Sequence, residues 1–113
     1  MPTYQTRSIT YHPHGCLEKT FTIHCLPWVS CAPLLNEIRV AASERKIISH
    51  AEALPDARDP IAHHAIAVGA DGRVIACGRL MPDGHVERIA VLPHEHQGLI
   101  RTALVEALLD LAR

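Results

Sequence analysis

Aromatic residues are scarce in this sequence of 113 residues, which has one Trp, two Tyr and one Phe. That scarcity argues against a stacking platform for single-stranded nucleic acid. The sequence also lacks a basic run and has a formal net charge of -1, so we expect no surface that tracks nucleic-acid phosphates. No apolar run approaches the length that a bilayer requires, and the N-terminus has no apolar stretch suited to a signal peptide. We therefore expect a cytoplasmic protein with no nucleic-acid or membrane partner.

Cysteine occurs four times, at irregular separations and without a C-x-x-C pair. The four residues are Cys16, Cys25, Cys31 and Cys77. In a reducing compartment they would be free thiols, and a free cysteine usually behaves as a small core hydrophobe. We expect that behaviour for each of them.

Histidine is frequent, with nine residues in the chain. His12, His14 and Cys16 alternate, which in an ideal strand would put three potential metal ligands on one face. Pro13 and Gly15 break the strand geometry at that place, and no second ligand pair has a zinc-like spacing. We expect solvated turn residues and no bound metal, with a structural metal site as the alternative.

The first half of the chain predicts a β-hairpin followed by a helix. Residues 4–12 and 16–26 are the expected strands, and Phe21, Ile23 and Cys25 share the apolar face that should point at the core. Ser30 is the expected N-cap of a helix that ends near Arg45. Its apolar stripe is Leu34, Leu35, Ile38, Ala41 and Ala42, flanked by Glu37 and Arg39 as solvated surface residues. Residues 46–60 are expected to be mostly loop, with a short helical piece at 47–48 as an option.

The second half predicts three strands in a meander and one amphipathic helix. The strands are expected at residues 65–68, 73–80 and 85–92, separated by turns rich in Gly, Asp and Pro. From about Gly98 the apolar period becomes helical, with the stripe Leu99, Ala103, Leu104, Ala107, Leu108 and Leu111. Chemistry is expected where the last strand leads into this helix.

Five segments of the chain carry a family pattern: Leu35–Arg39, Ala62–Ala65, Cys77–Gly84, Glu87–Pro93 and Thr102–Val105. Together they resemble the central part of the GNAT family of N-acetyltransferases over roughly residues 20–113. The resemblance implies an α/β protein of the α+β type, with a mixed, mainly antiparallel sheet, an N-terminal hairpin and flanking helices. It implies one domain over residues 1–113, in which 1–19 is an added strand and turn and 20–113 is the core.

The resemblance also implies acetyl-coenzyme A as cosubstrate. In the family, the last of these strands pairs with the pantetheine arm, and a loop of pattern Gln/Arg-x-x-Gly-x-Gly/Ala cradles the pyrophosphate at the helix N-terminus. In family register, His96 takes the Gln/Arg position, Leu99 and Arg101 fall where small residues belong, and Gly98 is the only glycine of the loop. The implied cofactor-binding residues are Ile89, Ala90, Val91, His96, Gln97, Gly98, Leu99, Ile100, Arg101 and Thr102.

Acyl transfer to an amine needs a base near the strand, because the amine must lose a proton before it attacks the thioester. His85 stands at the position where some family members keep a glutamate base, and histidine is a residue type commonly used as a general base near neutral pH. Glu87 is the nearest alternative, and strand alternation would put both on one face with Ile89. Without such a role, His85 is a turn residue and Glu87 a surface carboxylate.

Family members normally continue with a strand, a helix and a hairpin beyond the helix on which this sequence ends. Without them, the last strand is expected to have an open edge. A second copy could cover that edge, the chain's own N-terminal strand could, or the domain could be a remnant; we expect a homodimer.

Two functions stay open. The first is an N-acetyltransferase that moves an acetyl or acyl group from acetyl-coenzyme A to a small-molecule or peptide amine. The second is a non-catalytic GNAT-like module that binds a ligand or a partner chain.

Overall fold

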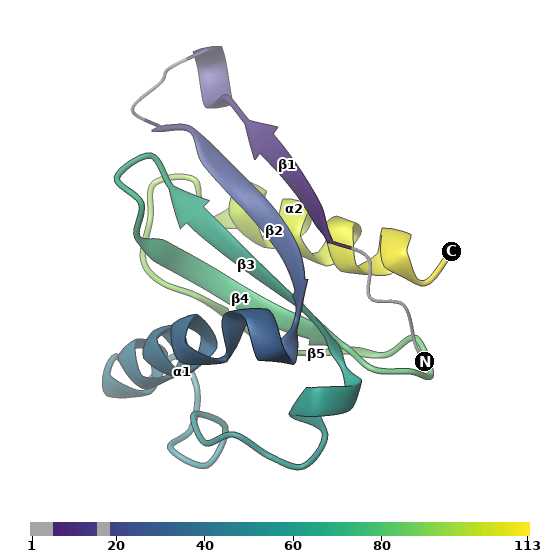
Figure 1. Ribbon diagram of the computed structural model, residues 1–113. Coiled ribbons are helices and arrows are strands. Elements are labelled where there is room, and N and C mark those ends of the chain that lie inside the picture. The colour runs from purple at the N-terminus through teal and green to yellow at the C-terminus, as the bar shows by residue number, and fades with distance from the viewer. Residues whose placement is uncertain (1–5, 16–18) are drawn as a thin grey trace.

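The computed structural model describes residues 6–15 and 19–113 of the chain. One five-stranded sheet has the order β1-β2-β3-β4-β5, and each neighbouring pair is antiparallel (Figure 1). The elements in chain order are β1 (Arg7–Tyr11), η1 (Pro13–Gly15), β2 (Phe21–Pro27), α1 (Trp28–Glu44), η3 (Asp59–Ile61), β3 (His63–Gly69), β4 (Val74–Leu80), β5 (Val86–Val91) and α2 (Gln97–Leu111). The expected α+β architecture is confirmed.

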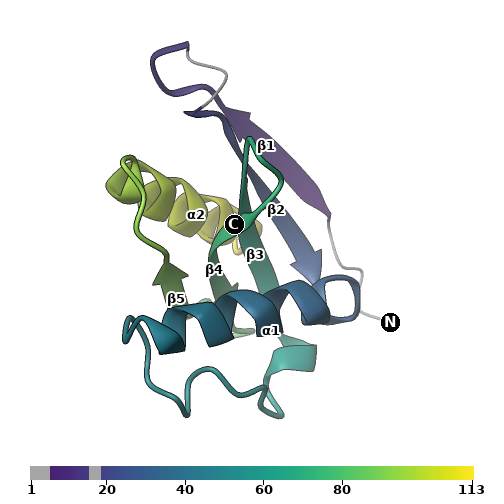
Figure 2. The ribbon, with the colours of Figure 1, turned by 90° about the vertical axis from the view of Figure 1, so that its left-hand side faces the viewer.

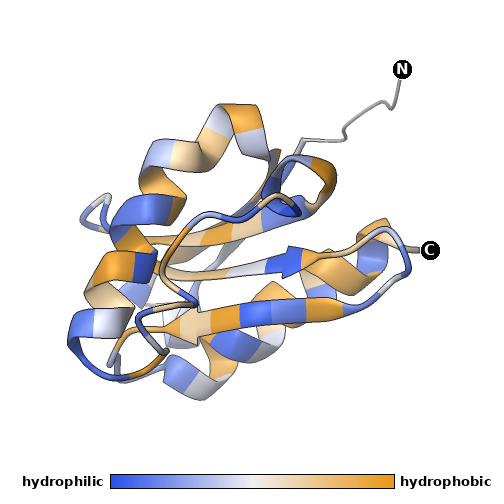
Figure 3. Ribbon diagram, turned by 90° about the horizontal axis from the view of Figure 1, so that it is seen from below, coloured by the Kyte–Doolittle hydropathy of each residue, from blue (hydrophilic) through white to orange (hydrophobic). Residues whose placement is uncertain are grey.

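The two helices lie on opposite faces of the sheet, so the molecule has three layers (Figure 2). Polar and apolar residues mix along both helices, as Figure 3 shows, because each helix buries only one side. The core between α2 and the sheet consists of Phe21, Ile23, Cys25, Ala65, Ala67, Ala76, Leu80, Val91, Ile100, Ala103, Leu104, Ala107 and Leu108. The core between α1 and the sheet consists of Cys31, Leu35, Ile38, Ala42, Ile66, Cys77 and Ala90.

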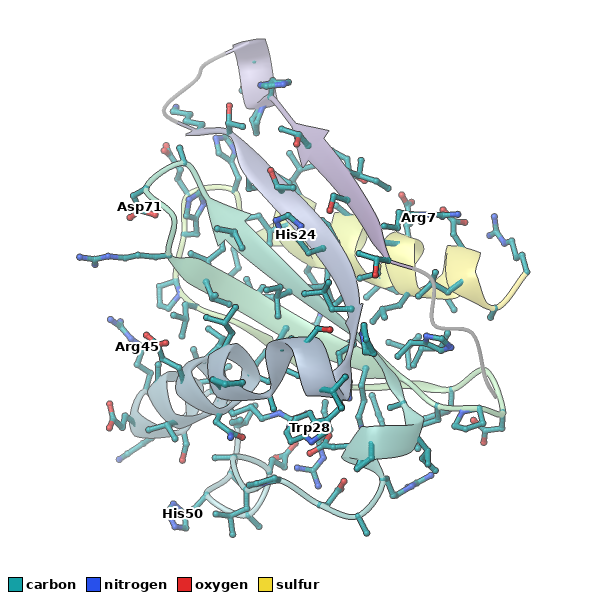
Figure 4. The ribbon with its side chains drawn as sticks, in the orientation of Figure 1. Arg7, His24, Trp28, Arg45, His50 and Asp71 are labelled. Carbon is teal, nitrogen blue, oxygen red and sulfur yellow. The ribbon has the colours of Figure 1, made fainter. Side chains whose placement is uncertain are left out.

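The predicted inward face of β2 is confirmed. Phe21, Ile23 and Cys25 are each 1% exposed and pack under α2. The opposite face pairs with β1 through polar side chains: Ser8 contacts His24 at 2.7 Å, and the hydroxyls of Thr10 and Thr22 are 3.0 Å apart. His24 is labelled in Figure 4, on the face of the sheet that carries α1.

The helix boundaries differ from expectation at α1. Ser30 is not the N-cap, because the helix begins at Trp28 and its N-cap is Pro27, which is in an extended conformation. No side-chain hydrogen bond caps this end; the Cys31 thiol instead donates to the Pro27 carbonyl at 3.2 Å. Within the predicted stripe, Leu34 is 39% exposed, whereas Arg39, expected on the surface, is 2% exposed.

The predicted apolar stripe of α2 is confirmed at Ala103, Leu104, Ala107 and Leu108, and it is wrong at its first residue. Leu99, predicted in the apolar stripe, is 45% exposed, and Ile100 is buried in its place. The helix therefore buries positions 100, 103, 104, 107 and 108, which keep the i, i+3, i+4, i+7 spacing of one helix face. The optional helical piece at 47–48 is absent; those residues form a bend after α1.

Three of the four cysteines lie in the described part of the chain, and all three are free and buried as predicted: Cys25, Cys31 and Cys77. Cys16, and with it the sulfur of the alternative His12–His14–Cys16 metal site, lies outside the described residues. Within residues 6–15 and 19–113, no group of three potential ligands could hold a metal ion, and no helix is long and apolar enough to cross a membrane.

Candidate functional site

A β-bulge interrupts β5 directly before the apolar triplet Ile89–Val91. Cys77 pairs with Ala90 and Arg79 pairs with Glu87, so Gly78 alone faces two residues of β5. One of these is Arg88, whose φ of 55° is left-handed and unusual for a residue other than glycine. Bulges of this kind are enriched next to active sites, where they redirect side chains.

The bulge overturns one prediction about β5. Glu87 was expected to share a face with Ile89, but the extra residue shifts the alternation between them. Glu87 lies on the α1 side, opposite Arg79, whereas Ile89 packs into the core under α2. Within the triplet the ordinary alternation holds: Ile89 and Val91 lie under α2, and Ala90 lies under α1.

The start of α2 presents backbone donors that have no acceptor among residues 6–15 and 19–113. The Gln97 N–H donates to the His94 carbonyl at 3.1 Å, and the Ile100 N–H donates to the His96 carbonyl at 2.9 Å. The first four N–H groups of a helix have no intrahelical acceptor, so those of Gly98 and Leu99 remain. No side chain caps this end, and a helix N-terminus carries a partial positive charge that favours anions.

The predicted cofactor-binding residues at the start of α2 fall into three groups. The exposed ones at the start of α2 are Gln97, Gly98, Leu99, Arg101 and Thr102. His96 is half-buried at the N-cap position, and its ring lies 6.0 Å from that of His94 and 5.9 Å from that of His14. Ile100 is fully buried in the α2-side core, so its side chain is unavailable to a ligand.

The two predicted catalytic residues lie at the other end of β5. His85 is exposed in the β4–β5 turn, where its carbonyl accepts from the Met81 N–H at 2.8 Å and its own N–H donates to Asp83. Glu87 is partly exposed, at 27%, and its Oε1 lies 3.2 Å from Arg79 Nη2 and 3.6 Å from Arg58 Nη1. Both contacts are to the same carboxylate oxygen, Oε1.

A buried ionic network lies behind Glu87, between α1 and the sheet. Arg39 of α1 donates to both carboxylate oxygens of Asp59, at 2.9 and 3.0 Å. Arg79 of β4 reaches the same carboxylate at 2.9 Å. Arg39, Asp59 and Arg79 are at most 2% exposed, so these charges depend on one another for compensation.

Asp56 extends this network to the surface. Arg79 contacts both of its oxygens, at 2.8 and 3.1 Å, and Arg88 contacts it at 3.1 Å. Arg88 also donates to the Glu52 carbonyl at 2.7 Å, so the bulged residue ties the loop after α1 to β5. Asp56 and Asp59 accept from each other's backbone N–H groups, both at 3.1 Å, in the reciprocal manner of a capping box.

The network shifts the protonation of its carboxylates. Burial acts to raise the pKa of Asp59, but the hydrogen bonds from Arg39, the Asp56 backbone and Arg79 outweigh it and lower that pKa to about 2. The hydrogen bonds from Arg79 likewise lower the pKa of Asp56. Both groups are therefore carboxylates at neutral pH.

His64 of β3 is fully buried beside this cluster and contacts Asp59. Its Nε2 lies 2.8 Å from the Asp59 carbonyl, to which it donates, and burial lowers its pKa, so the ring is neutral. The Trp28 ring lies 5.4 Å from the His64 ring and 5.7 Å from the Arg39 guanidinium carbon. Figure 4 shows Trp28 on the side of α1 that faces the loop around η3.

Sequence reasoning missed this network. Arg39 was assigned to the helix surface, and residues 46–60 were expected to be mostly loop. One signal was present: Arg39 falls four residues after Leu35 and three before Ala42, within the buried face of α1. A charge inside an apolar stripe requires a buried partner, and Asp59 supplies it.

Comparisons with family models, with curated proteins and with solved structures found no match to this chain.

Proposed function

We propose that this chain is a cytoplasmic GNAT-like N-acetyltransferase, which binds acetyl-coenzyme A along β5 and at the start of α2 and transfers the acetyl group to an amine. The observation that carries the proposal is the pair of unused N–H groups of Gly98 and Leu99, directly beyond the end of a bulged edge strand. A diphosphate matches converging N–H groups and a helix dipole. The pantetheine amides match the backbone groups on the outer side of β5.

In this proposal the network prepares the acyl-transfer end of the site. The amine must lose its proton as it attacks the thioester carbonyl, and the coenzyme A thiolate leaves. Glu87 would accept that proton on Oε2, while Arg79 holds Oε1 and fixes the carboxylate. His85 is the alternative base; it stands at the same end of β5 and is exposed.

The non-catalytic module is the second candidate, and two observations favour it. The Leu99 side chain stands exposed where a small residue would let phosphates approach, and Glu87 is engaged by two arginines. The non-catalytic module would bind a ligand or a partner chain. The two functions differ in whether coenzyme A is released from acetyl-coenzyme A when an amine is present.

The first test is thermal unfolding of the purified protein with acetyl-coenzyme A, coenzyme A or ADP. A ligand at a hundred times its dissociation constant adds about 2.7 kcal/mol to the unfolding free energy. The matched variants are Leu99→Glu and Leu109→Glu: both leucines are exposed on α2, at 45% and 38%, but only Leu99 lies at its start. We expect Leu109→Glu to keep the ligand-induced rise in Tm and Leu99→Glu to lose it.

Release of free thiol from acetyl-coenzyme A with a panel of amines then separates the two functions. The enzyme predicts turnover that Glu87→Gln reduces by a factor of about 100 or more, the usual contribution of a general base. Binding without turnover would favour the non-catalytic module. No rise in Tm with any of the three ligands would contradict the enzyme and leave a module that binds a partner chain.

The homodimer stays a prediction. β5 ends the sheet on one side and β1 ends it on the other, so within the described residues the N-terminal strand does not cover β5. Sedimentation velocity over a concentration series should show a dimer, and a monomer at every concentration would contradict the prediction.

A further inference from the structure

A pocket of about 370 Å³ opens between α1 and the turn that joins β3 to β4. Its lining is Leu34, Glu37, Ile38, Ala41, Gly72, Arg73, Val74 and Leu92. In Figure 4, the label Asp71 shows where the β3–β4 turn lies, and the label Arg45 shows where α1 ends. The pocket shares no residue with the acyl-coenzyme A site proposed above, so its function is a separate question.

The floor of this pocket is the open end of the α1-side core. Val74 and Leu92 pack against that core but remain partly accessible, and Leu34 is 39% exposed at the mouth. Ligand pockets are typically apolar concavities of roughly 300–1,000 Å³ with a few polar groups that fix orientation. A volume near the lower limit suits a small molecule with a short hydrocarbon part.

Two charged residues line the pocket, and only one has a partner. Arg73 lies 3.8 Å from Asp71, with 85% of its side chain exposed, so its charge is already balanced and solvated. The Glu37 side chain is exposed as well, and among the described residues it has no hydrogen bond or ion pair. Its neighbours along the same side of α1, Leu34 and Ala41, are apolar. The pocket therefore offers an apolar floor with one uncompensated carboxylate at its edge.

We propose that this pocket binds a small amphipathic primary amine, with its hydrocarbon on Leu34, Val74 and Leu92 and its ammonium group beside Glu37. An alcohol of the same shape would lose the charge attraction. A carboxylate would be repelled by Glu37. A cationic ligand is favoured because the Glu37 carboxylate is the charged group of the pocket that has no partner among the described residues.

The probe is n-hexylammonium, followed by methyl NMR of the full chain, with hexan-1-ol and hexanoate as matched ligands. A molecule of this size should bind with a dissociation constant on the order of 1–10 mM. We expect shifts of the Leu34, Ile38, Val74 and Leu92 methyl signals, with Ile100 in the other core unmoved. Hexylammonium should bind more tightly than hexan-1-ol, and hexanoate most weakly.

Glu37→Gln should weaken hexylammonium binding about threefold, as expected for a solvated charge pair, and leave hexan-1-ol binding unchanged. Glu44→Gln, an exposed carboxylate further along α1 and outside the pocket, is the matched control and should leave both unchanged. The proposal is overturned if hexanoate binds as tightly as the amine, or if Glu37→Gln has no effect. Methyl shifts that depend on protein concentration without ligand would also overturn it, because a second copy would then occupy the pocket.

Discussion

The Arg79 guanidinium lies 2.9 Å from the Asp59 carboxylate, and the two side chains are 1% and 0% exposed. Arg79 is on β4, and Asp59 is in the short helical turn before β3, so this contact joins the sheet to the loop that follows α1. Through Asp56 and Glu87 the same arginine reaches the surface beside the β5 bulge. Its surroundings thus determine both the stability of the α1 side and the position of the proposed base.

Replacing Asp59 by Asn should destabilise the protein strongly. Arg39 and Arg79 would keep their charges at buried positions with one partner lost, and breaking a buried ion pair in this way costs about 3–5 kcal/mol. Urea unfolding monitored by circular dichroism measures the loss. Asp71→Asn is the control, because Asp71 is 64% exposed in a turn and should change the unfolding free energy by less than about 0.5 kcal/mol. Equal effects of the two variants would contradict the role given to the network.

The fold was largely predictable from periodicity, and the network was not. Alternation in the strands and the helical spacing of residues 97–111 depend on neighbours in sequence, so they can be read locally. The partners of Arg39 and Arg79 stand 20 to 23 residues away, in a segment without periodicity. Only the folded chain brings them together.

The bulge in β5 was unpredictable for a related reason. Glycine and asparagine are the residues that most often adopt a left-handed backbone conformation, and their presence in a sequence can predict it. Here Arg88 adopts that conformation. Its hydrogen bonds to the Glu52 carbonyl and Asp56 are the compensation visible in the structure. Strict alternation therefore assigned Ile89 and Glu87 to the same face, which is wrong.

The neutral state of His64 predicts a pH dependence of stability. Burial lowers its pKa in the folded protein, whereas the unfolded chain takes up this proton near pH 6.5. The unfolded state therefore binds more protons below that pH, and the unfolding free energy should fall as the pH drops from about 7.5 to 5. In His64→Gln, which can still donate to the Asp59 carbonyl, this part of the fall should disappear. Urea unfolding at both pH values checks it; identical falls in the two proteins would refute the assignment.

A side chain at Gly78 should be destabilising where α2 crosses β4. A Cβ at this position would lie 2.8 Å from Leu104 Cδ2 and 3.3 Å from Leu108 Cδ1, and both leucines are fully buried. Overpacking of this kind costs about 1–3 kcal/mol, so Gly78→Ala should lower Tm by several degrees. Gly98→Ala is the matched control, since nothing lies within 4 Å of its Cβ position and Ala favours helix. A Gly78→Ala protein as stable as Gly98→Ala would show that α2 packs differently.

The most direct test of the proposed function is an amide NMR titration of the full chain with acetyl-coenzyme A. The account predicts that the largest shifts fall on the Gly98 and Leu99 N–H groups, with smaller ones along Ile89–Val91, and that the Leu99→Glu protein shows none of them. Saturating ligand that leaves the Gly98 and Leu99 signals in place would contradict binding at the start of α2, whatever shifts occur elsewhere.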